Sequence, residues 1–518
     1  MRYHPGSAQI FVLVAVGLRV KSMSKELFLG IDQGSSSTKT VLLDTVGEVV
    51  HELHLAVPEP QSLDRSVEQD GEALLSSVVD LFLQAKQWAH EEGHVLRAAG
   101  IACQRSGVLA WRALDGIPIH KMITWADTRT YPIIQNFGLG TERISGKTGI
   151  PTIAHFAAGK IAFLQREFLE PSVHVGTLDS FLVYRLSGRR VFATEDTMAS
   201  RTMLYTLAGR DWDGGLCHDF KVDIKRLPRI HPSLAPHTTF EGIPVLAMIG
   251  DQQAALIGRL NQKRRPLLNL GTIASVMIDT GVDCRPMPGL ITTVFLSRLI
   301  PGGFSKEFRF FSEITSPISG SILLEPCKRQ WAKDASDLNA LCINSYKESP
   351  QGRATAYFVH RRSALPHWPN GVSNVMVSKP EATVGDRARA IVENVGNLIL
   401  RMFDELIEKG MLKSAAAPVE FDVAGGGSEL DYLLQYLADC SGFAFHRLVN
   451  RNAGARGAAL CAWMSSTGVF EAYALNREEP DETYVCENSD RRKRYLMWQR
   501  LERDVLAKTL PPQAVIEE

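Results

Sequence analysis

The segment from Asp32 to Lys39 has the residue types and spacing of a phosphate-binding turn. It reads Asp-Gln-Gly-Ser-Ser-Ser-Thr-Lys and lies between two apolar runs. A Gly/Ser turn between strands exposes backbone N–H groups that bind anionic oxygens. The hydroxyls of Ser35, Ser36 and Thr38 would add donors, Lys39 would add positive charge, and Asp32 could hold Mg²⁺. An ordinary hairpin turn is the alternative interpretation.

A second glycine turn follows about half a chain later. Residues 266–280 again consist of an apolar run, a turn at Gly271-Thr272 and another apolar run. Two such turns that face each other can hold a polyphosphate between two domains. Taken alone, Gly271-Thr272 is equally typical of a plain turn.

Three successive glycines, Gly425 to Gly427, separate a strand-like run from a helix-like run. Because glycine has no Cβ, a flat ligand such as adenine or ribose could approach this backbone closely. A tight strand-to-helix connection with Ser428 as the N-cap is the alternative.

Asp251 follows the apolar run Pro244–Ile249 and precedes a helical pattern. This placement predicts a carboxylate at the C-terminal edge of a sheet, where open α/β sheets bind ligands. Phosphoryl transfer requires positioning, charge neutralisation and a group that accepts the proton of the attacking hydroxyl. Asp251 could be that group, and a simple N-cap is the other interpretation.

Polar residues also end two strand-like runs of the first half, at Gln104-Arg105 and at Trp125-Ala126-Asp127. Arg, Gln and Asp side chains can hydrogen bond to vicinal hydroxyls, and Trp can pack on the carbon face of a polyol. Solvated strand ends would have the same composition.

Alternating strand and helix patterns predict an α/β fold. The repeated turn indicates two duplicated domains, with a boundary in the polar stretch 261–265. The patterns predict strands at 27–44, 98–101, 107–111, 122–125, 244–249, 266–280 and 419–424, and helices at 68–92, 159–169, 252–260, 384–409, 425–439, 454–463 and 491–507.

Composition limits the function classes. The 518 residues are too many for one ordinary core, and 57 basic residues balance 57 acidic ones. This balance gives no electrostatic attraction to nucleic acid or an anionic membrane. Eight scattered cysteines without a CxxC pair indicate free thiols in a reducing cytoplasm. The apolar run 10–18 is too short to span a bilayer, and Met23 is the expected start, which makes residues 1–22 an upstream extension.

With these motifs, the chain resembles the FGGY carbohydrate kinase family over roughly residues 27–498, nearly its whole length. Each motif alone is weak, whereas the ordered set is specific. In chain order the motifs are Gly30-Ile31-Asp32-Gln33-Gly34, Val67-Glu68-Gln69-Asp70, Gln104-Arg105, Trp125-Ala126-Asp127-Thr128-Arg129, Gly176-Thr177-Leu178-Asp179-Ser180, Ala199-Ser200-Arg201-Thr202-Met203-Leu204, Gly250-Asp251-Gln252-Gln253-Ala254-Ala255, Gly271-Thr272, Gly425–Gly427 and Gly457-Ala458-Ala459.

The resemblance implies two ribonuclease-H-like domains of the actin and hexokinase superfamily, with ATP and substrate in an interdomain cleft that closes during turnover. It implies that Asp251 is the general base and that Mg²⁺ lies near Asp32 and Asp251. Implied nucleotide-binding residues are Asp32, Gly34, Ser35, Ser36, Ser37, Thr38, Lys39, Gly271, Thr272, Gly425, Gly426 and Gly427. Implied substrate-binding residues are Gln104, Arg105, Trp125, Asp127, His155, Asp251 and Gln252.

The same reading divides the chain into four parts. Residues 1–22 are the extension, 23–260 the N-terminal domain, 261–470 the C-terminal domain and 471–518 a charged tail with a surface helix. The expected activity is ATP-dependent transfer of a phosphate to a primary hydroxyl of a small sugar or polyol, in a cytoplasmic protein. No nucleic acid or membrane partner is expected, and self-association into a homo-oligomer stays open.

Four positions depart from the pattern of glycerol kinases within the family. Ser106 replaces a Glu, His155 a Tyr, Ser275 a Phe and Leu430 an Asn. These changes alter the contacts to glycerol and favour a larger sugar or sugar alcohol. A true glycerol kinase with a rebuilt pocket is one alternative. A non-catalytic ATP-binding sensor or scaffold with the same fold is another.

Overall fold

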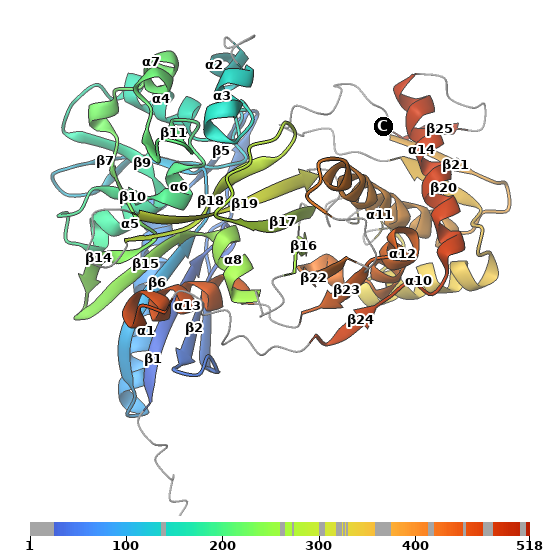
Figure 1. The fold of residues 1–518 in the computed structure, drawn as a ribbon, viewed down its shortest axis with the longest axis horizontal. Coiled ribbons are helices and arrows are strands. Elements are labelled where there is room, and N and C mark those ends of the chain that lie inside the picture. The colour runs from blue at the N-terminus through green and yellow to red at the C-terminus, as the bar shows by residue number, and fades with distance from the viewer. Residues whose placement is uncertain are drawn as a thin grey trace, which may run out of the picture.

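The protein forms two lobes that are joined by long strands (Figure 1). In this computed structural model, the described residues are 25–135, 141–259, 265–271, 274–299, 306–316, 324, 327, 330–357, 374–412, 419–448, 452–469, 480–507 and 514–517. The predicted extension 1–22 and the predicted site residue Thr272 lie outside these ranges.

The first half contains fifteen of the described strands. They are β1 Glu26–Gln33, β2 Ser37–Asp44, β3 Val49–Ala56, β4 Gln61–Leu63, β5 Ser66–Gln69, β6 Val95–Cys103, β7 Val108–Arg112, β8 Pro118–Ile123, β9 Val173–Thr177, β10 Ala193–Glu195, β11 Tyr205–Thr206, β12 Asp211–Trp212, β13 Arg229–His231, β14 Leu234–Phe240 and β15 Ile243–Gly250. The helices are α1 Gly71–Glu91, α2 Tyr131–Gln135, α3 Thr141–Thr148, α4 Ala158–Glu167, α5 Leu178–Leu186, α6 Asp196–Ala199, α7 Gly214–Phe220, the 3-10 turn η2 Ile224–Arg226 and α8 Asp251–Arg259.

The second half contains the remaining described elements. Its strands are β16 Leu267–Leu270, β17 Ala274–Gly281, β18 Ile291–Leu299, β19 Lys306–Ser316, β20 Ala354–Tyr357, β21 Asn374–Ser378, β22 Glu420–Ala424, β23 Ala444–Arg447, β24 Glu482–Tyr484 and β25 Ala514–Glu517. Its helices are α10 Ala335–Glu348, α11 Val384–Glu408, η4 Gly426–Glu429, α12 Asp431–Ser441, α13 Ala453–Thr467, η6 Ser489–Arg491 and α14 Arg492–Leu506.

Two five-stranded units repeat the same arrangement of strands. In the first unit the order is β3-β2-β1-β6-β15, with antiparallel pairing from β3 to β1 and parallel pairing from β1 to β15. In the second unit the order is β19-β17-β16-β22-β23, with the same two antiparallel and two parallel pairs. The duplication predicted from the two glycine turns is therefore confirmed.

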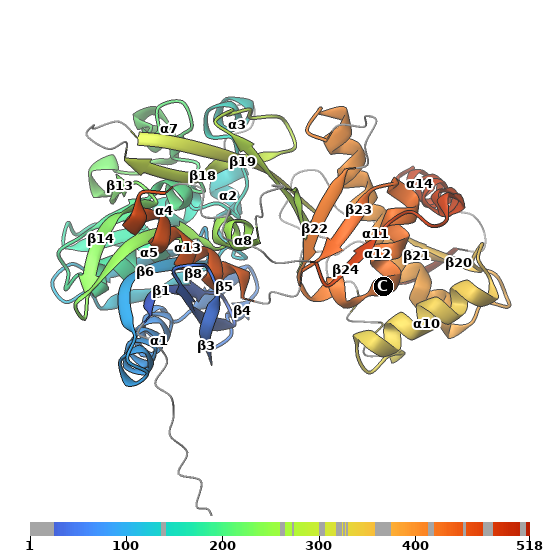
Figure 2. The same cartoon turned by 60° about the horizontal axis from the view of Figure 1, so that its bottom comes forward.

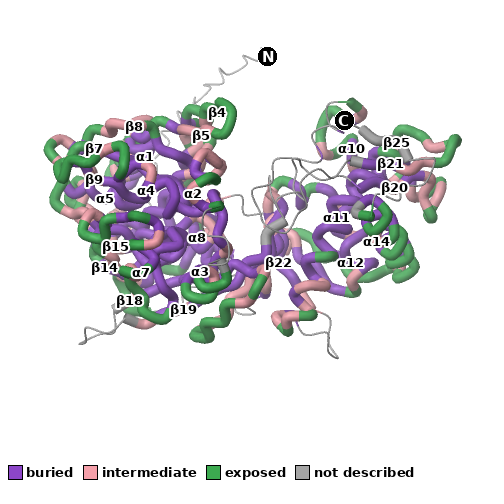
Figure 3. The backbone as a smooth tube through the Cα atoms, turned by 90° about the horizontal axis from the view of Figure 1, so that it is seen from above, coloured by how far each residue is buried: buried purple, intermediate pink, exposed green. Residues whose placement is uncertain are grey.

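The two units belong to one sheet. Strands β18 and β14 connect them, and their pairing consists of the single pair Leu234 and Arg298. Figure 3 shows that each lobe nevertheless has its own buried interior. Helices α11 and α1 illustrate how the sequence begins such elements: a Thr383/Asp386 capping box precedes α11, and Asp70 accepts the first N–H groups of α1.

Helix α13 returns from the second half of the chain to the first unit. It packs against β1, β6 and α8, and Figure 2 shows it across the strands of that lobe. Glycines allow the close approach, because a Cβ at Gly30 would lie 1.8 Å from the Ala455 carbonyl oxygen and one at Gly100 would lie 2.1 Å from that of Ala458. We propose that the domain boundary lies at the predicted stretch 261–265, so that the second domain begins at β16. Helix α13 is the exception, because it packs on the first lobe.

Two details differ from the sequence prediction. The helix predicted over 425–439 is interrupted at the buried Leu430, which lies between η4 and α12. The closing helix α14 was expected at the surface, but Trp498 on its inner face is fully buried. Its many charged residues concealed an apolar face.

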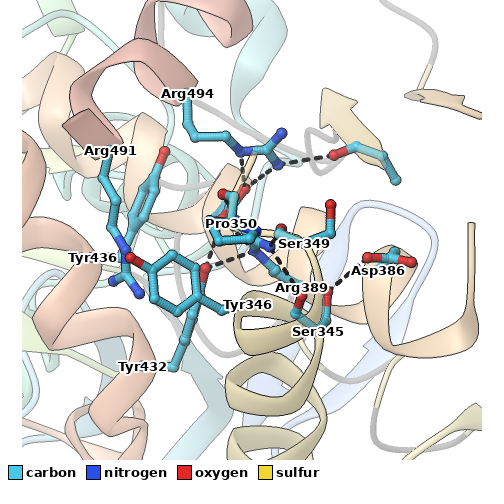
Figure 4. A network of polar contacts seen from close by, with 12 residues as sticks. Ser345, Tyr346, Ser349, Pro350, Asp386, Arg389, Tyr432, Tyr436, Arg491 and Arg494 are labelled. Carbon is cyan, nitrogen blue, oxygen red and sulfur yellow. Dashed lines mark hydrogen bonds and ion pairs between the residues drawn. The ribbon is translucent and has the colours of Figure 1, made fainter. Parts of the chain in front are cut away.

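A buried charge network fixes α14 to the second lobe (Figure 4). Glu393 of α11 accepts hydrogen bonds from Nε of Arg494 at 2.9 Å, from Nε of Arg389 at 2.8 Å and from the Tyr432 hydroxyl at 2.7 Å. Burial acts to raise the pKa of Glu393, but Arg494 and Arg389 outweigh it and lower that pKa to about 2. The tail helix is thus part of the second core.

All eight cysteines are free thiols. Among the described residues, no helix has the length and hydropathy that a membrane crossing requires.

We expect Gly100→Ala to lower the free energy of unfolding by about 1–3 kcal/mol, because its new methyl group overlaps the α13 backbone. Denaturant unfolding of the purified variant measures this. Gly146→Ala is the control, since nothing lies within 4 Å of that position in α3, and it should leave stability equal or slightly higher. Equal losses in both variants would contradict the packing of α13.

Candidate active site

Three neighbouring parallel strands end at the same edge of the first unit. Asp32 is near the end of β1, Gln104 directly follows β6, and Asp251 directly follows β15. The register places both Gln33 and Gly250 opposite Cys103 of the central strand. The structure therefore brings Asp32 and Asp251 together at the edge where ligands bind in such sheets.

Asp32 lies in an environment that disfavours its charge. Burial raises the pKa of Asp32 to about 7, and the negative charge of Asp251 also raises it, against Lys39 and Arg259. The N-terminus of α13 packs on this carboxylate, since a Cβ at Gly454 would lie 2.1 Å from Asp32 Oδ2. A helix N-terminus carries partial positive charge, so the ionised carboxylate is favoured on that side.

Glutamine side chains stabilise the turn after β1 through hydrogen bonds. The Gly34 N–H donates to Ser37 O at 3.0 Å, and Gln69 Nε2 donates to Ser35 O at 2.7 Å. Gln104 Nε2 in turn donates to Gln69 Oε1 at 3.2 Å. The predicted substrate residue Gln104 thus supports the turn through Gln69.

The predicted phosphate donors of this turn divide into two groups. Ser36 is exposed, and Ser35, Ser37 and Lys39 are partly exposed. Thr38 is fully buried, and its hydroxyl is hydrogen bonded to Ser77 of α1 at 2.6 Å. The Thr38 side chain therefore points into the core, and only its backbone could contribute to an anion site.

Asp251 makes two close contacts at the start of α8. Its Oδ1 accepts the Gln252 N–H at 2.7 Å and lies 3.0 Å from Nε of Arg105. Burial raises the pKa of Asp251, although Arg105 acts against this shift. The side chain is 29% exposed, so a ligand can reach a carboxylate whose proton affinity is above that of an ordinary Asp.

A row of polar side chains continues from this ion pair. Arg105 Nη1 lies 3.6 Å from Glu313 Oε2, and Arg201 Nη1 lies 3.4 Å from the same oxygen. Arg201 Nη2 lies 3.4 Å from Nε2 of His155. We call these five residues, Asp251, Arg105, Glu313, Arg201 and His155, the Asp251 cluster.

The surroundings lower the pKa values of His155 and Lys160 in this region. Burial lowers the pKa of His155 well below its usual value, as do Arg201, Lys160 and Arg105. Burial also lowers the pKa of Lys160 to about 7, and its Nζ donates to the carbonyls of His155 at 2.7 Å and Ser106 at 3.0 Å. Burial therefore favours the neutral form of the His155 imidazole, whose ring centre lies 5.8 Å from that of the partly exposed Trp125.

The strand end that carries Asp251 is anchored by a second set of buried groups. The Gly250 N–H donates to the Thr197 hydroxyl at 2.8 Å, and that hydroxyl donates to Glu195. Glu195 also accepts from the Ser233 hydroxyl at 2.8 Å. These contacts fix the backbone immediately before Asp251.

One predicted substrate residue is turned away from the cluster. Asp127 is fully buried and accepts hydrogen bonds from the Val67 N–H at 2.7 Å and from Arg129 Nη2 at 2.7 Å. Asp127 therefore joins β5 to the loop after β8, and these protein groups occupy its carboxylate in this structure.

The glycines of the second unit lie beside each other. Gly425 has a φ of +91°, and a Cβ there would lie 2.6 Å from the Leu270 carbonyl carbon, next to Gly271. Nothing lies within 4 Å of a Cβ added at Gly426. The Ser428 hydroxyl donates to Gly425 O at 2.7 Å, so it stabilises the turn and does not cap α12.

The residues fit a magnesium site only in part. No group of three or more metal-binding side chains occurs within the part of the chain that the structure describes. The negative charge of Asp251 raises the pKa of Asp32, and a divalent cation near the two carboxylates would relieve this repulsion. Water and phosphate oxygens would complete the coordination, as is usual for Mg²⁺.

Glu313 and Lys160 are not among the site residues predicted from the sequence, and Arg201 appears there only as part of a motif. A signal for Glu313 did exist, because it is an acidic residue inside the apolar run Phe310–Ile314.

A separate cavity of about 1000 Å³ lies between α4 and α7, lined by Gln165, Phe220 and others, and contains no predicted site residue.

We expect Asp32→Asn to change stability in a pH-dependent way. Between about pH 4 and 7 the folded protein keeps the Asp32 proton that the unfolded chain has lost, so wild-type stability falls as pH rises through this window. The gain in unfolding free energy of Asp32→Asn over wild type should grow from near zero at pH 4 to about 1–2 kcal/mol at pH 8, allowing for partial exposure.

Denaturant unfolding at several pH values measures this difference. Asp44→Asn is the matched control. Burial acts to raise the pKa of Asp44, but hydrogen bonds led by that from Lys25 lower it overall. Wild type therefore gains stability from Asp44 as pH rises, and Asp44→Asn should become less stable than wild type over the same range. A gain for Asp32→Asn that does not depend on pH would contradict the assigned environment.

Comparison with known proteins agrees with this geometry. The model of the N-terminal domain of the FGGY family of carbohydrate kinases matches residues 27–258. The glycerol kinase of Trichodesmium erythraeum is 26% identical over 475 residues, which cover 87% of this chain and 91% of that protein.

Solved structures share the fold at lower identity. The crystal structure of Plasmodium falciparum glycerol kinase with ADP has a TM-score of 0.82 at 20% identity, with 94% of this chain and 99% of that chain covered. The ligand-bound xylulose kinase of Lactobacillus acidophilus has a TM-score of 0.78 at 16% identity, with 93% and 99% covered. The expected actin/hexokinase-like fold is confirmed.

The duplicated units, the carboxylates at the strand ends and these similarities lead to one assignment. The chain is a phosphotransferase enzyme whose residues 27–258 match the N-terminal domain of the FGGY family of carbohydrate kinases and which is similar to glycerol kinases along most of its length.

Proposed function

We propose that the enzyme transfers the γ-phosphate of ATP to a primary hydroxyl of a small sugar or polyol. The observation that carries this proposal is the Asp251–Arg105 ion pair at the strand edge that also holds Asp32. It provides a proton acceptor, a hydroxyl-orienting guanidinium and a second carboxylate in one place. Phosphoryl transfer depends mainly on such positioning and electrostatics.

In this proposal Asp251 receives the proton of the attacking hydroxyl. Its raised pKa favours proton transfer to it, and Arg105 keeps the carboxylate oriented through Nε. Gly250, fixed by Thr197, prevents the strand end from shifting. His155 and Trp125 would contact the carbon chain and the remaining hydroxyls.

The nucleotide would lie between the two glycine turns. The Gly34–Ser37 turn and Gly271 offer backbone N–H groups, and the open surface at Gly426 would receive the adenosine. The similar Plasmodium falciparum structure, which was crystallised with ADP, supports nucleotide binding by this fold. Mg²⁺, when bound near Asp32 and Asp251, would neutralise phosphate charge.

The acceptor is proposed to be larger than glycerol. His155 belongs to the Asp251 cluster and Ser106 directly follows Arg105, so both replacements change the shape of this region relative to the glycerol kinase pattern. Ser275 lies buried on β17, opposite Thr315 of β19. Glycerol remains the second candidate, because the similar curated proteins are named glycerol kinases.

We expect Asp251→Asn to lower kcat about 10²- to 10⁴-fold while leaving the affinity for ATP within about threefold, since the amide keeps the shape but cannot accept the proton. Coupled ADP-release kinetics and calorimetric nucleotide titration measure the two quantities.

Asp115→Asn is the control for this prediction, because its ion pair with Arg112 lies on the surface. It should retain wild-type kinetics. Wild-type turnover by Asp251→Asn would show that another group accepts the proton.

A further inference from the structure

Glu313 is a substrate-pocket candidate that comes from the second half of the chain. It lies on β19, where the register sets it opposite Met277 of β17 and Ile291 of β18. It is buried, with 6% of its side chain exposed, and it contacts Arg105 and Arg201 of the first half. A buried carboxylate between two guanidinium groups is held in a fixed place.

The Glu313 carboxylate supplies Arg105 with a negative charge that the neighbouring Ser106 cannot supply. Ser106 directly follows Arg105, has a φ of +63° and is almost fully buried. Its short side chain brings no charge to Arg105. Glu313 contacts the same guanidinium through Nη1, so β19 provides Arg105 with a second acidic partner beside Asp251.

The Asp251 cluster connects Asp251 to His155 through three further side chains. Its members contact one another in sequence, from Asp251 through Arg105, Glu313 and Arg201 to His155. The reacting hydroxyl belongs at the Asp251 end of the row. Groups at the other end can then bind only hydroxyls farther along the acceptor.

Unsatisfied polar atoms along this row indicate which groups the acceptor presents. Ser106 Oγ, Arg201 Nε and Gln252 Oε1 are buried atoms without a hydrogen-bond partner in the described part of the chain. They comprise a donor, an acceptor and a hydroxyl that is both. Leaving such atoms unpaired is costly, and hydroxyl groups, which donate and accept, can satisfy all three.

The charges of the row favour an uncharged acceptor. Two guanidinium groups, Arg105 and Arg201, face two carboxylates, Asp251 and Glu313. Lys160 adds little, because its Nζ donates to two backbone carbonyls and burial lowers its pKa to about 7. An acid such as an aldonate would find no surplus cation.

From this arrangement we infer that Glu313, with Arg201, is a specificity-determining residue that binds hydroxyls of an uncharged acyclic polyol or ketose of at least four carbons. The inference rests on the proposed function and names the acceptor class of the same site.

The test compares Glu313→Gln with wild type on glycerol, erythritol and ribitol, using ATP and coupled ADP release with mass-spectrometric detection of the product. The isosteric amide removes the charge and one acceptor. We expect kcat/KM on ribitol to fall about 10- to 100-fold, mainly through KM, and kcat/KM on glycerol to fall less than threefold. D-Gluconate tests the charge argument and should be a poorer acceptor than ribitol.

Glu307→Gln is the matched control on the same strand, where Glu307 pairs with Arg298. It should leave all three acceptors unchanged. ADP affinity of Glu313→Gln, measured by calorimetry, reports whether the fold is intact, and Arg201→Lys provides a second variant that should show the same dependence on acceptor length.

Two failures are distinguishable. If wild type phosphorylates none of the acceptors, the proposed function itself is wrong. If wild type phosphorylates a polyol but Glu313→Gln and Arg201→Lys lose activity equally on glycerol and ribitol, or if gluconate is preferred, only the inference is overturned.

Discussion

The proximity of Asp32 and Asp251 at one sheet edge is the constraint on which the rest of the site depends. Burial raises the pKa of Asp32 to about 7, and repulsion from the negative charge of Asp251 contributes to this shift. The surrounding groups compensate: Arg105 contacts Asp251, and the N-terminus of α13 packs on Asp32. The fold thus keeps close together two carboxylates whose repulsion a bound cation would relieve.

The duplicated architecture explains how distant parts of the chain build this site. Each unit has two antiparallel and two parallel pairs in the same order, so each has a strand edge with a glycine turn. Helix α13 returns to cover the first unit, and β19 delivers Glu313 to residues of the first half. Motions between the lobes would therefore act directly on the Asp251 cluster.

The sequence predicted the parts of the site that depend on local pattern. Apolar runs that end in a polar residue identified the strand ends at Asp32 and Asp251, and the repeated glycine turn predicted the duplication. It failed where side-chain direction decides. Thr38 lies between Ser37 and Lys39 on β2, and because side chains alternate along a strand, it points to α1 while its neighbours do not.

Long-range partners were the other limit. Glu313 and Arg105 are separated by more than two hundred residues, and no local pattern reveals their contact. For Asp127, the position in a polar loop gave no sign that Arg129 and the Val67 N–H would hydrogen bond to its carboxylate. Such pairings follow only from the tertiary arrangement.

One measurement tests the central claim most directly. The purified enzyme is incubated with ATP, Mg²⁺ and a panel of uncharged polyols and ketoses of three to seven carbons, and products are quantified by mass spectrometry beside ADP. The account predicts equal amounts of ADP and of one phosphorylated acceptor, with strict dependence on that acceptor. ATP binding without any phosphorylated product, across the whole panel, would contradict it.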